Sequence, residues 1–177
     1  ITGGGDVAFG AQNGAGASHT VCTALPGRGV LDDRWHHVAV QRGSGGRLQI
    51  WVDGRRRANA AGPTGDLSCP AAAAGARATD PFLVLGAEKH DAGPAYPSYS
   101  GKLDELRVST TQRYATTFTP RRRPFTPDAS TAALYHFDEA TGTTVRDTSG
   151  AAGGPSPGMM RRNVAGTRPA RVTDNPF

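Results

Sequence analysis

Apolar and polar side chains alternate along much of this chain with the two-residue period of β-strands. The strongest runs are residues 35–41 and 47–53, which flank the Gly-rich segment 43–46. We predict that these two runs form a β-hairpin. The dipeptide Asp53-Gly54 then predicts a tight turn at the end of the second strand.

Shorter runs with the same period predict further strands, each bounded by Gly, Pro, Asp or Asn. They are residues 6–10, 19–25, 101–109, 132–137 and 142–145. Helical periodicity is almost absent. Many short strands between turn signals are typical of an all-β chain, and we predict an antiparallel β-sandwich of the jelly-roll type.

The remaining segments are less regular. The continuous apolar run 81–86 predicts a strand buried on both faces, and residues 58–80 predict a short strand followed by a loop. Residues 88–100 predict a polar surface loop, and residues 110–123 a single helical turn. We expect residues 1–150 to form the domain, with 151–177 as a Gly/Pro-rich extension or its closing strand.

Composition sets the size of the core and limits the class of protein. The chain has 177 residues, with 24 Gly, 13 Pro and 37% hydrophobic residues, which is enough apolar material for one domain. No stretch approaches the roughly 18 apolar residues of a membrane span. The chain starts at Ile1 without a targeting pattern, so we expect a mature chain, a processed product or a fragment.

The positive charge carries little functional information. The formal net charge is +5, but only Lys89 and Lys102 are lysines, and this Arg bias is typical of a GC-rich bacterial genome. The Arg runs 55–57 and 121–123 lack the interleaved aromatic residues of nucleic-acid sites. We interpret them as solvated loop charges and expect no nucleic-acid partner.

The two cysteines, Cys22 and Cys69, are too far apart in sequence for a CxxC or zinc motif. An even pair in a loop-rich chain predicts one disulfide and an oxidising compartment. The alternative is two buried free thiols. With the disulfide interpretation, we expect a secreted or cell-surface protein.

Three stretches together resemble the laminin-G-like, concanavalin-A-like jelly-roll superfamily. Residues 34–40 (RWHHVAV) are similar to its Trp-His-His-Val-Ala strand, and residues 48–54 (LQIWVDG) to the strand and turn that follow. Residues 101–108 (GKLDELRV) are similar to its Gly-x-hydrophobic-Asp-Glu strand. The resemblance covers roughly residues 5–150 and implies a jelly roll with a binding or adhesion role.

The order of these stretches differs from the family pattern. Only 34 residues precede Trp35, so we expect the first strands of the sandwich to be missing. Residues 133–150 resemble the start of such a domain. The second half therefore closes this sandwich or opens a following repeat, and we expect exposed strand edges that upstream chain or a neighbouring subunit covers.

The resemblance also allows a test for catalysis. Related glucanases carry acidic residues at alternating strand positions, so that two carboxylates face one groove. Here Asp104 and Glu105 are adjacent, and in a strand they point to opposite faces. Arg107 and Ser109 occupy the positions where further acids are needed. We predict that the chain is not an enzyme.

Members of the superfamily often bind Ca²⁺ through carboxylate and carbonyl oxygens, which implies a structural Ca²⁺ here. The predicted ligands are Asp104 and Asp138, with Asp91 or Asp6 as further candidates. No Asp-x-Asp-x-Asp loop is present. The alternative is that Asp104 caps a turn or pairs with an arginine.

Sugar recognition requires aromatic faces beside planar polar groups. His90, Tyr96 and Tyr99 lie in the loop 88–100, and Trp51 lies on the strand face opposite Leu48, Ile50 and Val52; these four are the predicted ligand-binding residues. For Trp51 the alternative is packing on the sheet. Adjacent strand residues face opposite ways, so His36 and His37 are not a metal-binding pair.

We therefore expect a secreted bacterial module without catalytic activity that binds carbohydrate or an extracellular protein within a larger protein. One alternative is a structural subunit of an extracellular assembly, completed by strands from upstream chain or a neighbour. Another is an accessory domain of a secreted hydrolase.

Overall fold

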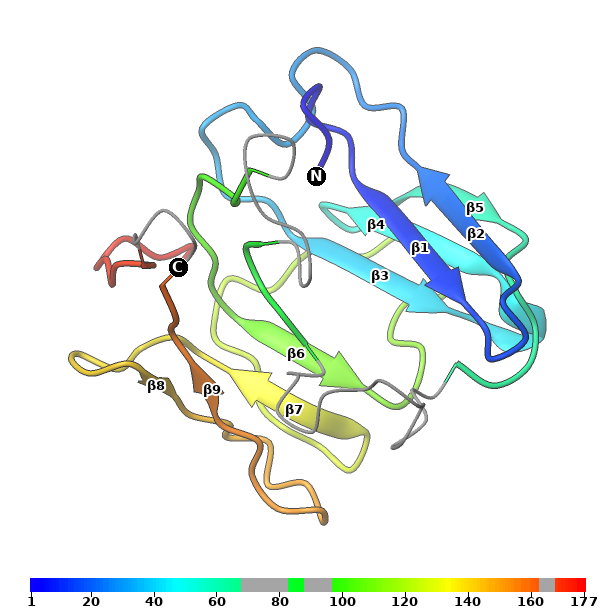
Figure 1. The fold of residues 1–177 in the computed structure, drawn as a ribbon. Coiled ribbons are helices and arrows are strands. Elements are labelled where there is room, and N and C mark those ends of the chain that lie inside the picture. Colours follow the sequence, from blue (N-terminus) through cyan, green and yellow to red (C-terminus); the bar gives the residue numbers. More distant parts are fainter. Residues whose placement is uncertain (68–82, 88–96, 163–167) are drawn as a thin grey trace. The chain divides into compact units, whose positions relative to one another are not determined.

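The computed structural model describes residues 1–67, 83–87, 97–162 and 168–177. Its internal contacts divide the chain into two compact units, which we describe separately (Figure 1). The first unit comprises Ile1–Ala73 and Thr111–Arg121. The second unit comprises Ala74–Thr110 and Arg122–Phe177. Cys69, His90, Asp91 and Tyr96 lie outside the described residues.

The described part of the first unit contains two antiparallel sheets. Strand β1 (Ala8–Gln12) pairs with β2 (Ser18–Cys22). Strands β3 (Val38–Arg42), β4 (Leu48–Val52) and β5 (Arg55–Ala60) form a sheet with β4 in the middle. The predicted hairpin is confirmed as β3–β4, with a short 3-10 turn, η1 (Ser44–Gly46), at its tip.

The apolar core of the first unit lies between its two sheets. Leu48, Ile50 and Val52 alternate along β4 and are 0–3% exposed. They pack with Val7 and Val21, which come from the β1–β2 side. The two-residue period thus determines which face of β4 points into this core, and the unit is a small sandwich.

The opposite face of β4 is covered by residues 111–121. The rings of Tyr114 and Phe118 stack with centroids 3.8 Å apart, and both contact the ring of Trp51. The Gln41 side chain donates to the Tyr114 carbonyl (2.6 Å) and accepts from the Tyr114 backbone N–H. The helical turn predicted for 110–123 is wrong, since these hydrogen bonds to the sheet hold the segment in an irregular conformation.

The predicted Asp53-Gly54 turn is confirmed between β4 and β5. Both residues have positive φ, 50° for Asp53 and 74° for Gly54, as a two-residue hairpin turn of this hand requires. The Phe118 N–H donates to the Gly54 carbonyl (3.0 Å). A Cβ on Gly54 would lie 1.8 Å from the Phe118 carbonyl oxygen, so this contact requires glycine.

The second unit contains two short antiparallel strand pairs among its described residues. Strand β6 (Leu106–Ser109) pairs with β7 (Thr131–Tyr135), and β8 (Thr144–Val145) pairs with β9 (Gly158–Met159). The strand predicted for 101–109 begins only at Leu106, because Glu105 is left-handed with φ 55°. The prediction that Asp104 and Glu105 lie in one strand is therefore wrong.

The buried strand predicted for the apolar run 81–86 is wrong for its described residues. Leu83 and Leu85 are 54% and 43% exposed, and neither lies in a strand. Apolar side chains alone do not make a strand, because its backbone N–H and C=O groups need a ladder partner. No such pairing reaches residues 83–85 in the part of the chain that the structure describes.

Polar side chains hold much of the second unit together. Asp147 accepts hydrogen bonds from the backbone N–H groups of Leu134, Ser149 and Ser156, at 2.9–3.0 Å. Burial raises the pKa of Asp147, but these hydrogen bonds outweigh burial and lower its pKa below the ordinary value. Arg171 similarly donates to the Glu139 carboxylate and the Thr144 carbonyl, both at 2.9 Å.

The fold class is all-β, an antiparallel β-sandwich with almost no helix. Within the described residues, no helix has the length and apolar character needed to cross a membrane. The arrangement leaves two polar clusters at strand ends, one in each unit.

Candidate functional site

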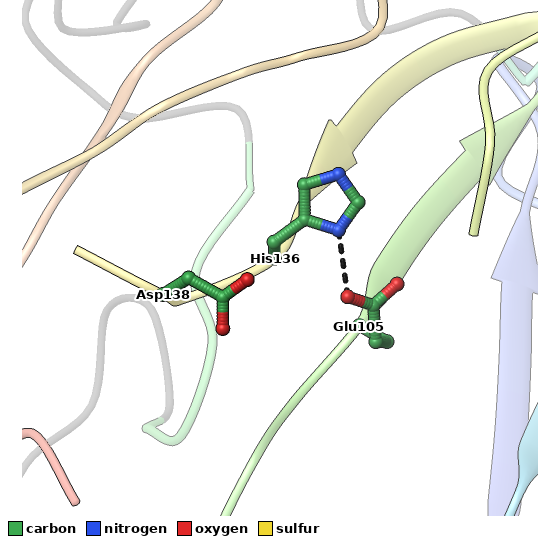
Figure 2. A group of neighbouring side chains, drawn as sticks. All are labelled: Glu105, His136 and Asp138. Atoms are coloured by element: carbon green, nitrogen blue, oxygen red, sulfur yellow. Dashed lines mark hydrogen bonds and ion pairs between the residues drawn. The ribbon is translucent and has the colours of Figure 1, made fainter. Parts of the chain in front are cut away.

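Glu105, His136 and Asp138 converge at one end of the β6–β7 pair, and we call them the Glu105 cluster (Figure 2). One potential ligand atom from each residue lies within 4.8 Å of the other two. His136 Nδ1 and Glu105 Oε1 are 2.6 Å apart and form a hydrogen bond. The group combines two carboxylates with an imidazole, which is a metal-ligating set.

The antiparallel register explains why these residues meet. Leu106 at the start of β6 lies opposite Tyr135 at the end of β7. Glu105 precedes β6 and His136 follows β7, so both lie at the same end of the strand pair. Glu105 and Phe137 both have positive φ (55° and 62°), and the ladder ends there.

The members of the Glu105 cluster differ in exposure. The Glu105 side chain is 7% exposed, and its Oε2 accepts a hydrogen bond from the Phe125 N–H (2.7 Å). The Arg107 guanidinium lies over the Phe125 ring, 4.3 Å from its centroid. His136 is partly buried and Asp138 is exposed. Glu105 is thus a positioned carboxylate, with Oε1 directed at His136.

Asp104 lies next to the cluster without being part of it. Its Oδ1 accepts a hydrogen bond from the Glu105 N–H (3.0 Å), which matches the alternative that Asp104 caps a turn. Burial is the main cause that raises the pKa of Asp104 to about 6, and the nearby charges of Glu105 and Asp138 add to it. Of the two predicted ligands, Asp138 is a member of the Glu105 cluster and Asp104 is not.

The donor set of the Glu105 cluster differs from the oxygen-only set that the sequence predicts for Ca²⁺, of which the candidate Asp91 lies outside the described residues. Ca²⁺ takes 6–8 oxygen ligands, whereas one of the three converging groups here offers a ring nitrogen. Sequence reasoning missed Glu105 and His136 because it treated 101–109 as one strand. The pairing of the motif 101–108 with the segment 133–139 is the signal that finds them.

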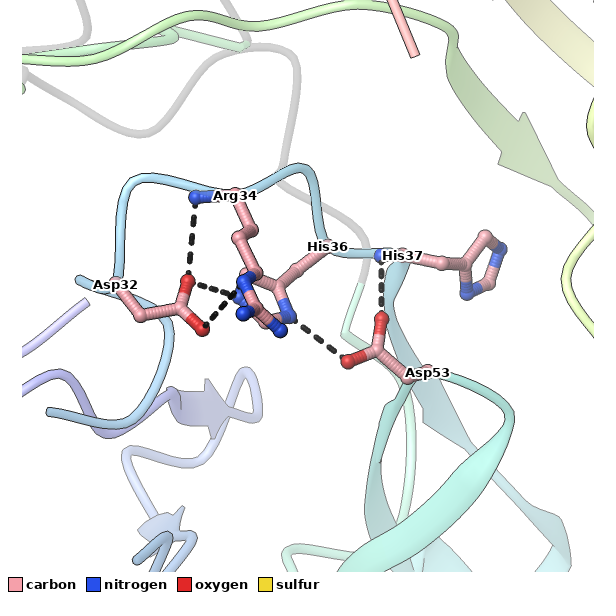
Figure 3. A network of polar contacts seen from close by, with 5 residues as sticks. All are labelled: Asp32, Arg34, His36, His37 and Asp53. Carbon is pink, nitrogen blue, oxygen red and sulfur yellow. Dashed lines mark hydrogen bonds and ion pairs between the residues drawn. The ribbon is translucent and has the colours of Figure 1, made fainter. Parts of the chain in front are cut away.

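A second polar cluster lies in the first unit, just before β3 (Figure 3). His36 Nδ1 lies 2.8 Å from Asp53 Oδ2, and His36 Nε2 lies 2.8 Å from Asp32 Oδ1. Asp53 Oδ1 also accepts from the His37 N–H (3.0 Å). We call this arrangement the His36 bridge, since it ties residues 32–37 to the β4–β5 turn.

The geometry of the His36 bridge favours the imidazolium form. Both ring nitrogens face carboxylate oxygens, and only the protonated ring donates from both. Burial lowers the pKa of His36, but the hydrogen bonds to Asp32 and Asp53 outweigh it and raise the pKa above the ordinary value. His37 instead makes edge contacts with the rings of Tyr114 and Phe118, so the two histidines face different groups.

The predicted ligand-binding residues do not form one site among the described residues. Trp51 is 1% exposed beneath Tyr114 and Phe118, so its ring is part of the packing and offers no face to a ligand. Tyr99 is 39% exposed. Asp6, a further candidate for Ca²⁺, accepts from Thr23 Oγ1 and Leu25 N, each at 2.8 Å.

A hollow lies beside the β4–β5 turn. We call it the Arg55 hollow. Its volume is about 480 Å³, and it is lined by Asp53, Arg55, Thr117, Phe118, Thr119 and Pro120. A second hollow of about 360 Å³ is lined by Glu139–Thr144 and Arg146 in the second unit.

Comparison with known families supports the resemblance found in the sequence. Residues 1–117 match the family model described as the concanavalin A-like lectin/glucanases superfamily. The match spans more than half of the chain, and the chain belongs to this superfamily. Searches of curated proteins and of solved structures found no match.

Proposed function

We propose that this concanavalin A-like chain is a non-catalytic carbohydrate-binding module of a larger secreted protein. Membership of the superfamily indicates a carbohydrate- or protein-binding module. The observation that favours carbohydrate is the Arg55 hollow, where Asp53, Arg55 and Phe118 are among the residues that line one depression. Planar polar groups beside an aromatic face are the usual elements of a sugar site.

Two of the residues that line the Arg55 hollow, Asp53 and Phe118, are held in place before any ligand arrives. Both oxygens of Asp53 are engaged, one by His36 and the other by the His37 N–H. Phe118 is held by its N–H bond to Gly54 and by stacking on Tyr114. Preorganisation of this kind lowers the entropic cost of binding a flexible sugar.

The absence of catalysis is part of the proposal. Glu105 and Asp138 are neighbouring carboxylates, but both oxygens of Glu105 are occupied by Phe125 N–H and His136. Neither of the two hollows described above is lined by Glu105 or Asp138. A glycosidase needs its two carboxylates in a groove that holds the sugar chain.

The test of carbohydrate binding uses the complete 177-residue chain on a glycan array, followed by titration of the best ligand. Replacing Arg55→Ala is expected to weaken binding at least about tenfold, because one charge-assisted hydrogen bond is lost. The matched control is Arg57→Ala, an exposed arginine of β5 outside the hollow. An array without binding at high protein density, or equal affinity for R55A and wild type, contradicts the proposal.

The secreted location rests on the cysteines. Cys22 is exposed on β2, and its predicted partner Cys69 lies outside the described residues. We propose that the two form a disulfide in an oxidising compartment. Alkylation followed by intact-mass measurement, with and without reductant, tests this pairing. Full alkylation without reductant contradicts it.

A second candidate function is assembly through strand edges, favoured by strand β3. Val38 and Val40 lie opposite Val52 and Ile50 in the ladder, yet they are 41% and 46% exposed. Among the described residues β3 pairs only with β4. An added strand from another chain is the partner that such an edge accepts. Light scattering that shows a monomer at high concentration contradicts self-assembly.

A further inference from the structure

We infer that the Glu105 cluster binds a first-row divalent transition metal such as Zn²⁺, and not Ca²⁺. The inference is independent of carbohydrate binding, since the Arg55 hollow lies in the other unit. It starts from the chemistry of the three groups. An imidazole nitrogen is a good ligand for Zn²⁺ and a poor one for Ca²⁺, while carboxylates accept both ions.

The distances allow one ion to contact all three groups after small side-chain movements. In tetrahedral coordination with bonds of about 2.0–2.1 Å, ligand atoms lie about 3.3 Å apart. Glu105 Oε1 and His136 Nδ1 are already 2.6 Å apart, and the three ligand atoms lie within 4.8 Å of one another. Asp138 is exposed, so its carboxylate is free to rotate toward the other two.

The surroundings of Glu105 orient its carboxylate as those of a metal ligand do. The side chain is 7% exposed, and the Phe125 N–H holds Oε2 at 2.7 Å. The Arg107 guanidinium packs over the Phe125 ring and supports that contact. Oε1 is thereby directed toward His136. Outer hydrogen bonds to ligating carboxylates are typical of protein metal sites.

Three protein ligands leave at least one coordination position for water or for an oxygen of a bound molecule. This distinguishes the site from a closed structural zinc site with four side-chain ligands. Asp104 is not among the three residues whose potential ligand atoms converge, and its Oδ1 accepts from the Glu105 N–H.

The test is a calorimetric titration of the complete chain with Zn²⁺ and, separately, with Ca²⁺. We expect one Zn²⁺ to bind and a large excess of Ca²⁺ to leave its affinity unchanged. Asp138→Asn and His136→Gln should each weaken Zn²⁺ binding at least about tenfold. Matched controls are Asp33→Asn and His19→Gln, which make the same changes at exposed positions of the first unit.

The outcomes separate the alternatives. Asp138 is exposed, so D138N is expected to fold as the wild type does, and thermal unfolding without metal checks this. Loss of Zn²⁺ affinity in D138N but not in D33N supports the site. Absence of Zn²⁺ binding, Zn²⁺ binding that D138N and H136Q leave unchanged, or displacement of Zn²⁺ by Ca²⁺ would overturn it.

Discussion

The two units of this chain reach an ordered state by different means. In the first unit, β4 is covered on one face by the apolar core and on the other by Tyr114 and Phe118, so Leu48, Ile50 and Trp51 are almost fully buried. In the second unit, the buried apolar side chains among the described residues are Leu134 and Val145. There Asp147 and Arg171 bond the backbone of neighbouring loops.

The difference shows where a small sandwich can place charged and polar side chains. In the unit with an apolar core, a polar side chain such as Thr23 is buried with hydrogen-bond partners, and the charged groups of the His36 bridge are partly exposed. A unit with little apolar core is ordered by directional hydrogen bonds to charged side chains. In the second unit, the register of β6 and β7 and the left-handed residues at their ends bring Glu105, His136 and Asp138 together. Four experiments test this comparison.

The largest expected effect is a cavity in the first unit. Ile50→Ala removes a fully buried side chain from the sandwich core and should lower the free energy of unfolding by about 2–5 kcal/mol. Denaturant unfolding followed by tryptophan fluorescence measures it, because Trp51 is adjacent on β4. A loss below about 1 kcal/mol would show that the two sheets do not pack through Ile50.

Two glycines with positive φ sharpen the comparison. Gly54→Ala should cost about 2–4 kcal/mol, since the left-handed conformation is strained and the new Cβ meets the Phe118 carbonyl. Gly142 has φ 83° with nothing within 4 Å of its would-be Cβ. Gly142→Ala should therefore cost only the conformational strain of about 1–2 kcal/mol. Thermal unfolding of both variants gives the difference, and equal losses contradict the close contact at Gly54.

The hydrogen bonds that Asp147 accepts in the second unit should weaken when its charge is removed. Asp147→Asn leaves one acceptor oxygen where the carboxylate had two, and should cost about 1–3 kcal/mol at neutral pH. The native pKa of Asp147 is lowered, so its stabilisation is present above its ordinary pKa and is lost as pH falls through the native value. The gap between wild type and D147N in denaturant unfolding should close in acid. Asp33→Asn is the control, and a gap that is independent of pH contradicts the tie.

The smallest effect is expected from the His36 bridge. The bridge raises the native pKa of His36, so its stabilisation is complete below the ordinary histidine pKa and disappears as pH rises through the raised value. His36→Gln should cost less than about 1 kcal/mol, because Asp32 and Asp53 are partly exposed. The charged groups around the ring are Asp32, Asp53 and Arg34. Unfolding at pH 5 and pH 9 measures the difference, which should be larger at pH 5; the reverse order contradicts the bridge.

How much of the fold could be predicted from the sequence depends on the kind of element. The alternation in 47–53 and the Asp53-Gly54 dipeptide predicted β4 and its turn, because side-chain period and turn chemistry are local. The apolar run at 83–85 predicted a buried strand that is not formed, because a strand also needs a partner for its backbone hydrogen bonds. The sequence left two interpretations of Trp51 open, a ligand site and packing on the sheet. Local pattern does not decide between them, because Tyr114 and Phe118, which cover its face, lie about 60 positions away.

The candidate metal centre shows the same division. From the resemblance to the superfamily, the sequence predicted Asp104 and Asp138 as Ca²⁺ ligands. In the structure, Glu105 and His136 converge with Asp138, because Glu105 is left-handed and the register of β6 and β7 places Glu105 and His136 at the same end of the strand pair. Two features therefore cannot be predicted from the local sequence pattern: a positive φ in a non-glycine residue, and a pairing between segments about 30 residues apart.

The sequence alone determined the all-β class, the β3–β4 hairpin, the Asp-Gly turn and the superfamily. It could do so because side-chain period, turn chemistry and family motifs are properties of neighbouring residues. Only the tertiary structure decided which polar groups meet: His36 with Asp32 and Asp53, and Glu105 with His136 and Asp138. Contacts of this kind depend on strand register and on backbone conformation at strand ends. These are set by packing of the whole unit and not by the residues that make the contact.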